Sequence, residues 1–463
     1  MEIVLAPWDF SPGGDEDRRI QDHSTLPGVA AQCLEDDPLG GTLPQRVRVI
    51  AGSDFEPSSE VLQPGGQRVW YSFGPMRIFV LGVGGTGSLL AQLLERQGHT
   101  VWCGDREPER AKRFLGKKSR IPVEEVNARS LWGIVRAARG CHLVVNASPA
   151  QFNEIVLRAA LRLGVHYLDL NSRLTRNPFK AEQLRFQKKF VAKNRVALIN
   201  TGIAPGLTNL LVKRSSELLD RVETVQIRLY ESTKSEDPVS TWSHEVAYDE
   251  AVSRPRVYND GRFRFAKRFS EREIFRFASP VGEAPVYLAA QDEVGTLPYF
   301  VSMRHMDVKI GGSDIEQLRR WHRQGKLNRS RGMAEKLFPK TPTPRTVARL
   351  IRSGVLENAR LAAAVLVRGT RDDQPILVRW DASFPTLYQL RLRGITATPI
   401  SYATAHLSAL FIKHFERDTG GVFPPETLPV EVRRKILAET RLRDIRIRLK
   451  LKRSKRAEED EEL

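Results

Sequence analysis

The sequence predicts an α/β fold class on three observations. From Met76 onward, short apolar runs alternate with amphipathic stretches, as in a parallel sheet covered by helices. The glycine-rich residues 82–87 stand between the first apolar run and the first amphipathic stretch. After about residue 205 the chain changes to polar loops, aromatic-rich runs and Gly-containing turns, which is typical of an α+β domain. Together these patterns predict a Rossmann-like domain joined to a second domain of mixed structure.

Five strands are expected in the first domain, at residues 77–81, 100–104, 142–146, 165–170 and 196–200. Between the first two, a helix is expected because one helical face collects Leu89, Leu90, Leu93 and Leu94. Gly98 follows at the place where a left-handed cap ends a helix. Alternating strands and helices of this kind predict parallel strand pairing.

The second half carries fewer regular patterns. A strand is expected at 222–230, and helices are expected at 314–324, 346–366 and 404–415. Near the end, apolar residues alternate with basic ones over Ile445, Ile447, Leu449 and Leu451. This period of two predicts a strand with one buried face. We interpret the basic side as solvated, with a phosphate-binding stripe as the alternative, and we expect the acidic residues 458–462 to be disordered.

Composition narrows the function classes. A chain of 463 residues with 41% hydrophobic and 28% charged residues suits a packed protein of two or three domains. There is neither an apolar run of about 18 residues nor a secretory signal, so the expected compartment is the cytoplasm. Cys33, Cys103 and Cys141 form no CxxC or Cys/His cluster, so neither a disulfide framework nor a metal is expected. The net charge of +18 raises a nucleic-acid alternative, which the absence of any binding motif disfavours.

Residues 1–75 differ from the rest of the chain. They contain 12 acidic residues, 5 Arg and no Lys, and Pro and Gly recur throughout. Helical periodicity is absent, so we expect a poorly ordered extension. Because Met76 opens a strand directly, this extension is interpreted either as an appendage or as a consequence of start-codon choice.

The strongest local signal is the run Gly82-Val83-Gly84-Gly85-Thr86-Gly87, which follows a strand and opens a helix. In such a turn the first glycine permits the tight bend, the second lets the backbone approach a pyrophosphate, and the third lets the helix pack on the strand. The helix N-terminus adds free N–H groups and a partial positive charge. The run therefore predicts a dinucleotide site, the alternative being a glycine-rich turn that binds nothing.

Two further groups belong to the expected cofactor site. Asp105 ends the second strand, 18 residues beyond Gly87, where a carboxylate hydrogen-bonds the adenosine ribose. This favours NAD, whereas the guanidinium of Arg106 would suit the 2′-phosphate of NADP. At the end of the strand at 142–146, Asn146, Ala147 and Ser148 are expected against the nicotinamide side, with packing alone as the alternative.

At this point the chain resembles the saccharopine dehydrogenase-like family, which includes saccharopine reductase, carboxynorspermidine dehydrogenase and relatives of homospermidine synthase. The resemblance rests on MRIFVLGVGGTG, CGDRE, VVNASP, HYLDLNS and NTGIAPGLTNLL, followed by TWSHEVAYDEAV, RVYNDG, GTLPYF and GGVFPPETLP. It covers about residues 76–450. It implies an NAD(P)-binding domain at 76–204, an inserted substrate and dimerisation domain at 205–400, and a C-terminal segment at 401–463 that returns to the first domain. Members commonly pair as dimers, so a homodimer is expected.

The resemblance also implies a chemistry, namely hydride transfer between nicotinamide and a carbon bonded to nitrogen. Such a reaction needs a proton acceptor and cations for substrate carboxylates. The catalytic candidates are His244 for the proton, Arg256 as a carboxylate clamp, and Tyr258, with Trp242, as a wall of the pocket. The alternatives are a loop or core histidine, a surface arginine and core aromatics.

Two further groups of residues are expected near the substrate cleft. Residues 202–206 are expected to form a turn that shapes the cleft, and Asp169 and Asn171 are expected either to face the cleft or to cap a helix. The sequence thus predicts an NAD(P)-dependent oxidoreductase, and the resemblance implies that it acts on the C–N bond of a small amino-acid-derived amine or imine. The alternative is a nucleotide-binding regulatory or scaffolding protein without catalysis.

Overall fold

The computed structural model describes residues 74–453 apart from 238, 241–242, 328–336, 338 and 416–418. Almost all of the expected N-terminal extension, the acidic residues 458–462 and Trp242 lie outside the described residues. None of the helices in the described part is long and apolar enough to cross a membrane. In the same residues, no group of three or more His, Cys, Asp or Glu is arranged to hold a metal ion.

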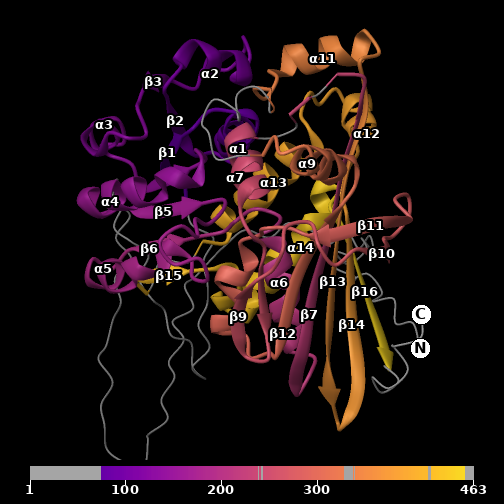
Figure 1. Cartoon of the computed structure of the whole chain (residues 1–463). Coiled ribbons are helices and arrows are strands. Elements are labelled where there is room, and N and C mark those ends of the chain that lie inside the picture. The colour runs from indigo at the N-terminus through magenta and orange to yellow at the C-terminus, as the bar shows by residue number, and fades with distance from the viewer. Residues whose placement is uncertain are drawn as a thin grey trace, which may run out of the picture. The chain divides into compact units, whose positions relative to one another are not determined.

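A seven-stranded sheet has the order β15-β6-β5-β4-β1-β2-β3 (Figure 1). We call this sheet with the helices on its faces the first half of the molecule, and the second sheet with its helices the second half. All its neighbouring pairs are parallel. Its strands are β1 (Arg77–Leu81), β2 (Thr100–Asp105), β3 (Val123–Glu125), β4 (Leu143–Asn146), β5 (His166–Asp169), β6 (Val196–Leu198) and β15 (Gly421–Phe423). The five predicted strands are confirmed. The sequence does not reveal β3 and β15, because these three-residue strands do not lie in a longer apolar run, as β6 does.

Helices cover both faces of this sheet. One face carries α1 (Gly85–Arg96), α2 (Pro108–Leu115) and α13 (Pro399–Lys413), which share one apolar cluster with the strands. The other face carries α3 (Leu131–Ala137), α4 (Asn153–Leu163) and α5 (Gln187–Ala192). The apolar side predicted for the first helix is confirmed, because Leu90 and Leu94 of α1 are fully buried.

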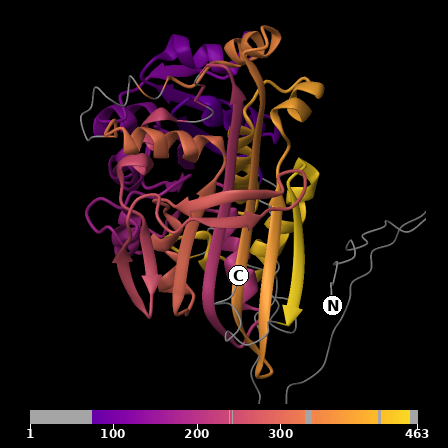
Figure 2. The same ribbon diagram turned by 45° about the vertical axis from the view of Figure 1, so that its right-hand side comes forward.

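A second sheet of nine strands has mixed direction, with the main order β10-β11-β12-β7-β13-β14-β16. Its strands are β7 (Arg221–Ser235), β8 (Arg256–Asn259), β9 (Arg262–Phe265), β10 (Glu273–Arg276), β11 (Glu283–Leu288), β12 (His305–Gly311), β13 (Leu356–Arg371), β14 (Gln374–Ser383) and β16 (Arg446–Arg453). Figure 2 shows the long strands β7, β13, β14 and β16 side by side, crossed by the β10–β11 hairpin. The strands predicted at 222–230 and near Ile445 are confirmed as β7 and β16.

The helix predicted at 346–366 is wrong in its second half. The helix α11 (Pro344–Arg352) ends before Gly354, whose φ of +80° stops it, and the chain continues as β13. This strand lies between β7 and β14. Val365 and Val367 are buried on one face of the sheet, and Ala364 is buried on the other. A strand covered on both sides is apolar throughout and does not alternate, so its sequence imitates a buried helix.

The remaining helices of the described residues lie between β6 and β16 in the chain. They are α6 (Leu207–Ser216), α7 (His244–Val252), α8 (Leu297–Phe300), α9 (Ser313–Arg323), α12 (Leu387–Leu392) and α14 (Val430–Glu439), with short 3-10 turns η1 (Ala150–Phe152), η2 (Glu182–Phe186), η3 (Glu293–Gly295), η4 (Pro425–Thr427) and η5 (Thr440–Arg443). The helices predicted at 314–324 and 404–415 are confirmed as α9 and α13. Within the C-terminal segment, α13 and β15 lie with the first sheet and β16 lies in the second.

The helix α13 contributes to the apolar cores of both halves. Leu407 packs in the cluster of the second sheet, whereas Leu410 packs in the cluster of the first. A helix that is apolar on most of its circumference is stable only when it is buried on most sides. The two sheets are therefore joined through a shared helix as well as through the chain that runs from β6 into α6.

Candidate functional site

The glycine turn, residues 82–87, is packed so closely that two of its glycines admit no side chain. Gly82 has φ of +93°, and a Cβ placed on it would lie 2.7 Å from the backbone nitrogen of Ser148. A Cβ on Gly87 would lie 1.9 Å from the carbonyl oxygen of Gly82. These contacts hold β1, α1 and the end of β4 together, as the spacing of the first and third glycines predicts.

Gly84 is different, because no atom lies within 4 Å of the position that its Cβ would take. Gly84 is the N-cap of α1, and Thr86 is half-buried in the first turn of that helix. The first N–H groups of a helix have no partner within the helix and carry its partial positive charge. The open space at Gly84 therefore fits the pyrophosphate of a dinucleotide, and the residues present suit that cofactor.

Asp105, at the end of β2, is held against the glycine turn. The N–H of Val83 donates to its Oδ2 at 2.7 Å, and the N–H of Glu107 donates to its Oδ1 at 2.9 Å. A carboxylate fixed in this way can accept hydrogen bonds from ribose hydroxyls with its remaining lone pairs. The neighbouring Arg106 points outward, with 74% of its side chain exposed and an ion pair to Glu107 at 3.4 Å. Both candidate groups for recognition of the adenosine ribose therefore lie at the same end of the turn.

The residues expected on the nicotinamide side, Asn146, Ala147 and Ser148, lie directly against the glycine turn. The N–H of Ala147 donates to the carbonyl oxygen of Leu81 at 2.8 Å. The side chain of Asn146 donates to Asn153 Oδ1 at 2.8 Å and accepts from the N–H of Ser148 at 3.2 Å. The structure thus brings together all the residues predicted to hold the cofactor, at the carboxyl ends of β1, β2 and β4.

Asp169 neither faces open space nor caps a helix. Its side chain is fully buried and accepts hydrogen bonds from Tyr167, Gln183 and the N–H of Asn200 at 2.9, 3.0 and 2.9 Å. Burial raises the pKa of Asp169 to about 7, against these hydrogen bonds, which lower it. Both interpretations made from the sequence are therefore wrong for this residue, which instead ties β5 to the chain after β6. The half-buried Asn171 offers its carbonyl oxygen to Asn153 and Gln183.

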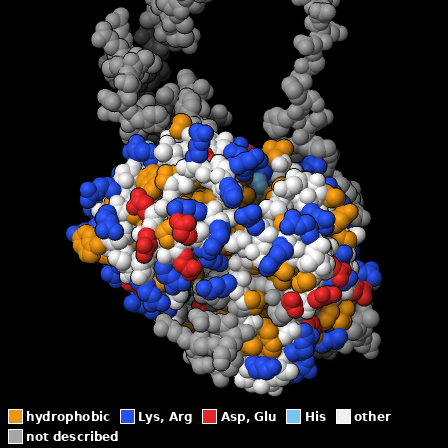
Figure 3. All heavy atoms as spheres, turned by 90° about the horizontal axis from the view of Figure 1, so that it is seen from above, with side chains coloured by type: hydrophobic (Ala, Val, Ile, Leu, Met, Phe, Trp, Pro, Cys, Tyr) orange, Lys and Arg blue, Asp and Glu red, His pale blue; other side chains and the backbone are white. Residues whose placement is uncertain are grey.

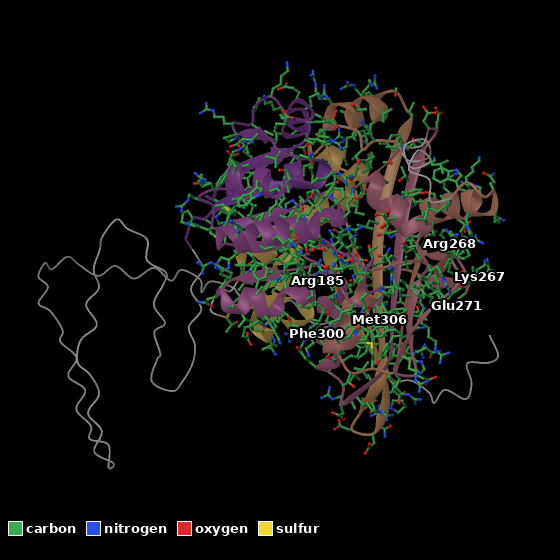
Figure 4. All side chains as sticks on the ribbon, turned by 60° about the vertical axis from the view of Figure 1, so that its left-hand side comes forward. Arg185, Lys267, Arg268, Glu271, Phe300 and Met306 are labelled. Carbon is green, nitrogen blue, oxygen red and sulfur yellow. The ribbon has the colours of Figure 1, made fainter. Side chains whose placement is uncertain are left out.

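The chain after β5 meets the second half at a junction formed by Asp292 and Arg256. The N–H of Ser172 donates to Asp292 Oδ2 at 3.2 Å, and Arg256 donates to the carbonyl oxygen of Leu174 at 3.3 Å. Desolvation raises the pKa of Asp292 to about 6, although the charge of Arg256 lowers it. Figure 4 labels Arg185 of η2, which follows the first sheet's strand β5, and Phe300 of α8, which precedes β12 of the second sheet.

Three further carboxylates gather near the junction, and the sequence did not single them out. Desolvation raises the pKa of Glu231 to about 8 and that of Glu293 to about 7, and it raises the pKa of Glu250 well above the ordinary range. The charges of Glu231, Asp292 and Glu293 all act on Glu250. Glu231 also lines a small pocket with Asp314, Arg360 and Ile400. Groups whose pKa lies near neutrality are suited to proton transfer.

Of the three catalytic candidates, Arg256 is at the junction and is turned toward Leu174 and Asp292, so its role as a substrate clamp stays a prediction. Tyr258 lies two residues further along β8, with its ring 4.9 Å from that of Phe263. Phe263 stacks on Phe179 of the first half at 5.4 Å, so Tyr258 belongs to an aromatic cluster that spans the two halves. His244 is the first residue of α7, but its side chain lies outside the described residues.

Three of the sequence motifs meet in a buried polar network at the start of α6. Thr208 donates to Glu293 at 2.9 Å, and Asn209 donates to Glu426 at 3.0 Å and to Thr296 at 3.2 Å. Glu293 and Glu426 are almost fully buried. The motifs around residues 200–209, 293–300 and 421–427 are thus adjacent in space, which no local pattern in the sequence could show.

The turn before α6, residues 202–206, is as tight as the sequence predicts. Gly206 has φ of +136°, and a Cβ placed on it would lie 2.0 Å from the carbonyl oxygen of Gly202. The N–H of Gly206 donates to Asn209 Oδ1 at 2.9 Å, so the side chain at the third helical position satisfies the backbone at the start of α6. This turn carries the chain from the first sheet into the second half.

Comparison with known proteins agrees with this architecture. Residues 78–198 match the family model described as the saccharopine dehydrogenase NADP binding domain. Apo saccharopine dehydrogenase (L-Glu forming) from Saccharomyces cerevisiae is similar over 82% of this chain and 100% of its own, with 11% identity and a TM-score of 0.59. That likeness establishes a common fold.

Two other solved structures are more distant. A probable dehydrogenase from Thermotoga maritima covers 81% of this chain and 98% of its own, with 9% identity and a TM-score of 0.38. The WlbA dehydrogenase from Bordetella pertussis covers 66% of this chain and 78% of its own, with 12% identity and a TM-score of 0.32. These two scores are too low to support an argument. The match at residues 78–198 and the common fold thus make the chain similar to saccharopine dehydrogenases and support an NAD(P)-dependent oxidoreductase.

Proposed function

We propose that this protein transfers a hydride between nicotinamide and a carbon bonded to nitrogen in an amino-acid-derived amine or imine. One observation carries the proposal: the segment at 172–174, which follows β5 of the cofactor sheet, contacts both Asp292 and Arg256 of the second half. Ligands of open parallel sheets lie beyond the carboxyl ends of the strands. Ionisable groups at that edge stand where a substrate would meet the nicotinamide.

In the oxidative direction the substrate loses a C–H bond with its electron pair, and its nitrogen loses a proton as the C=N bond forms. Bound nicotinamide supplies the acceptor for the hydride. Asp292, whose pKa is raised to about 6, is the group that we assign to the amine proton, and Glu250 stands nearby to share it. Water then adds to the imine, which separates into an amine and a carbonyl compound. Reduction of an imine follows the same steps in reverse.

The charges at the junction also favour a class of substrate. The charges of Glu231, Asp292 and Glu293 act on Glu250, and Asp292 also interacts with Arg256. Ammonium groups of a substrate would relieve the repulsion among the carboxylates, and Arg256 would receive a substrate carboxylate. We therefore expect a compound that carries several amines and at least one carboxylate, of carboxynorspermidine-like rather than tricarboxylate character.

The first test is calorimetric titration of NAD, NADH, NADP and NADPH into the full chain. We expect micromolar binding of one oxidised and reduced pair, weakened at least tenfold by Asp105→Ala, because the ribose hydrogen bonds are lost. Glu109→Gln, an exposed change on α2, is the control. Absence of binding by all four dinucleotides would rule out the proposal.

Turnover is the second test, with secondary amines under oxidation and with aldehyde-plus-amine mixtures under reduction. Binding without turnover of any such compound would favour a regulatory or scaffolding role.

The homodimer that the family resemblance implies remains part of the proposal, and sedimentation equilibrium of the full chain measures it. Basic side chains on the face seen in Figure 3 are interspersed with acidic and apolar ones. Salt-dependent binding of oligonucleotides is the corresponding check on the nucleic-acid alternative.

A further inference from the structure

Gly85 is the one glycine of the turn that the dinucleotide motif does not require. In the motif only the positions of Gly82, Gly84 and Gly87 need glycine. A Cβ on Gly85 would nevertheless lie 2.9 Å from Ser401 Oγ and 3.8 Å from Thr341 Cγ2. Ser401 is a buried residue in the first turn of α13, and Thr341 precedes α11. Gly85 is thus close to two segments that are more than 250 residues away in the chain.

The segment at 339–343, which we call the strap, is anchored on both sides of this contact. At one side, Arg110 of α2 donates to the carbonyl oxygen of Thr341 at 3.2 Å. At the other, Thr343 caps α11, whose N-terminal turn includes Thr346, by a hydrogen bond of 3.4 Å. The helix α11 lies beside α2 at the top of Figure 1. The strap therefore crosses from the second half to α2 and lies against the start of α1, where the phosphates of a dinucleotide would bind.

We propose that the strap and the first turn of α13 form a second wall of the dinucleotide site, and that the strap holds bound dinucleotide by its contact with Arg110. This inference rests on the proposed cofactor site, and it adds the strap as the segment that covers this site. Release of the dinucleotide then requires the hydrogen bond between Arg110 and Thr341 to open. Arg110 acts as a positioning residue, because it holds the strap and is not itself required to touch the cofactor.

The first experiment compares Gly85→Ala, Ser401→Ala and the double variant by calorimetric titration with the preferred dinucleotide. The new methyl group of Gly85→Ala would meet Ser401 Oγ at 2.9 Å, so we expect dinucleotide binding to weaken at least tenfold. Ser401→Ala removes that oxygen, so the double variant is expected to bind within about threefold of Ser401→Ala alone. A double variant as weak as Gly85→Ala would overturn the proposal, because Gly85 would then be required by the cofactor itself.

The second experiment measures the release of bound NADH or NADPH by stopped-flow fluorescence. Arg110→Ala is expected to raise the dissociation rate constant about tenfold and to leave the association rate constant within about twofold, because the strap loses its anchor. Arg110→Lys keeps a donor and is expected to recover part of the loss. Arg113→Ala, an exposed change on the same helix, is the matched control.

The outcomes separate the two proposals. Wild-type binding with an unchanged dissociation rate in Arg110→Ala, or an effect confined to association, would refute the strap and leave the proposed function intact. A wild-type chain that binds none of the dinucleotides would refute the proposed function itself. The melting temperature of each variant is recorded with and without dinucleotide, so that a folding defect is distinguished from a change in release.

Discussion

The glycine turn and the junction both lie beyond the carboxyl ends of strands of the first sheet, but they are built from different chemical groups. The glycine turn offers backbone N–H groups, one fixed carboxylate at Asp105 and open space at Gly84. The junction brings half-buried ionisable side chains together, with Asp292 and Arg256 from separate strands and loops. Backbone groups do not titrate, so we expect dinucleotide binding at the glycine turn to depend on shape. Chemistry at the junction is expected to depend on the protonation of its side chains. The difference separates binding from chemistry, and substitutions can address each region alone.

The largest expected effects are on dinucleotide binding and stability, and they come from substitutions of two glycines in the turn. Gly87→Ala places a methyl carbon 1.9 Å from the carbonyl oxygen of Gly82, so we expect loss of dinucleotide binding together with about 2 to 3 kcal/mol of stability. Gly84→Ala meets no atom within 4 Å, so its unfolding free energy should stay within about 1 kcal/mol while binding falls by about a hundredfold. Chemical denaturation and calorimetric titration of both variants check this. Equal loss of stability in the two variants would contradict the assignment of open space at Gly84 to the pyrophosphate.

The next effect concerns Asp292. We expect Asp292→Asn to lower kcat about a hundredfold, because a general acid or base typically contributes at least this much. We also expect the limb of the kcat profile near pH 6, the value to which desolvation raises the pKa of Asp292, to disappear. Dinucleotide binding should be unchanged, since Asp292 lies in the second half. Asp373→Asn, in the exposed turn between β13 and β14, is the control. A normal pH profile in Asp292→Asn would assign the proton transfer to another group.

The third effect is on stability and concerns Glu293. Burial raises the pKa of this carboxyl from 4.5 to about 7. Between these values the folded state keeps a proton that the unfolded state releases, so the free energy of unfolding decreases as the pH rises through this window. We expect Glu293→Gln to remove this decrease, which is on the order of a few kcal/mol, while the amide oxygen still accepts from Thr208.

Urea denaturation at about pH 5 and about pH 8 measures this effect, with the exposed Glu124→Gln as the control. The stability difference between Glu293→Gln and the wild type should be larger at the higher pH. If the two proteins lose the same free energy between the two pH values, Glu293 does not hold a proton in the folded state.

The smallest expected effect tests recognition of the ribose. Arg106 is 74% exposed, so its substitution should not disturb the fold. We expect Arg106→Ala to weaken NADPH binding about tenfold, because a charged hydrogen bond to the 2′-phosphate is lost, and to change NADH binding less than threefold. Titration of both dinucleotides into the variant measures the ratio. Equal weakening of the two would show that Arg106 does not distinguish them.

Local patterns were sufficient for most of the first half. The five predicted strands of the first sheet have clear apolar runs, and the glycine turn has a spacing that follows from the geometry of a bend, a phosphate and a helix. Asp105 was predicted for the same reason, because its place at the end of β2 is set by the chain just before it. Each of these features depends on residues that are near one another in sequence.

The second half and the contacts around β5 were less predictable because they depend on distant segments. The run at 356–371 was interpreted in part as a helix, since only its place between β7 and β14 makes it a strand. Asp169 has the position of a site residue but is enclosed by Tyr167, Gln183 and the chain after β6. No pattern in the sequence pairs Asp292 with the N–H of Ser172, 120 residues away.

By itself, then, the sequence determined the parallel sheet, the glycine turn and the carboxylate at the end of β2. Only the tertiary structure decided that Glu231, Asp292 and Glu293 lie near Glu250, and that Ser401 and Thr341 lie against Gly85. The physical reason is the range of the interactions. Helix and strand periodicity and turn geometry act over a few neighbouring residues, whereas desolvation and close packing depend on which distant segments the fold brings into contact.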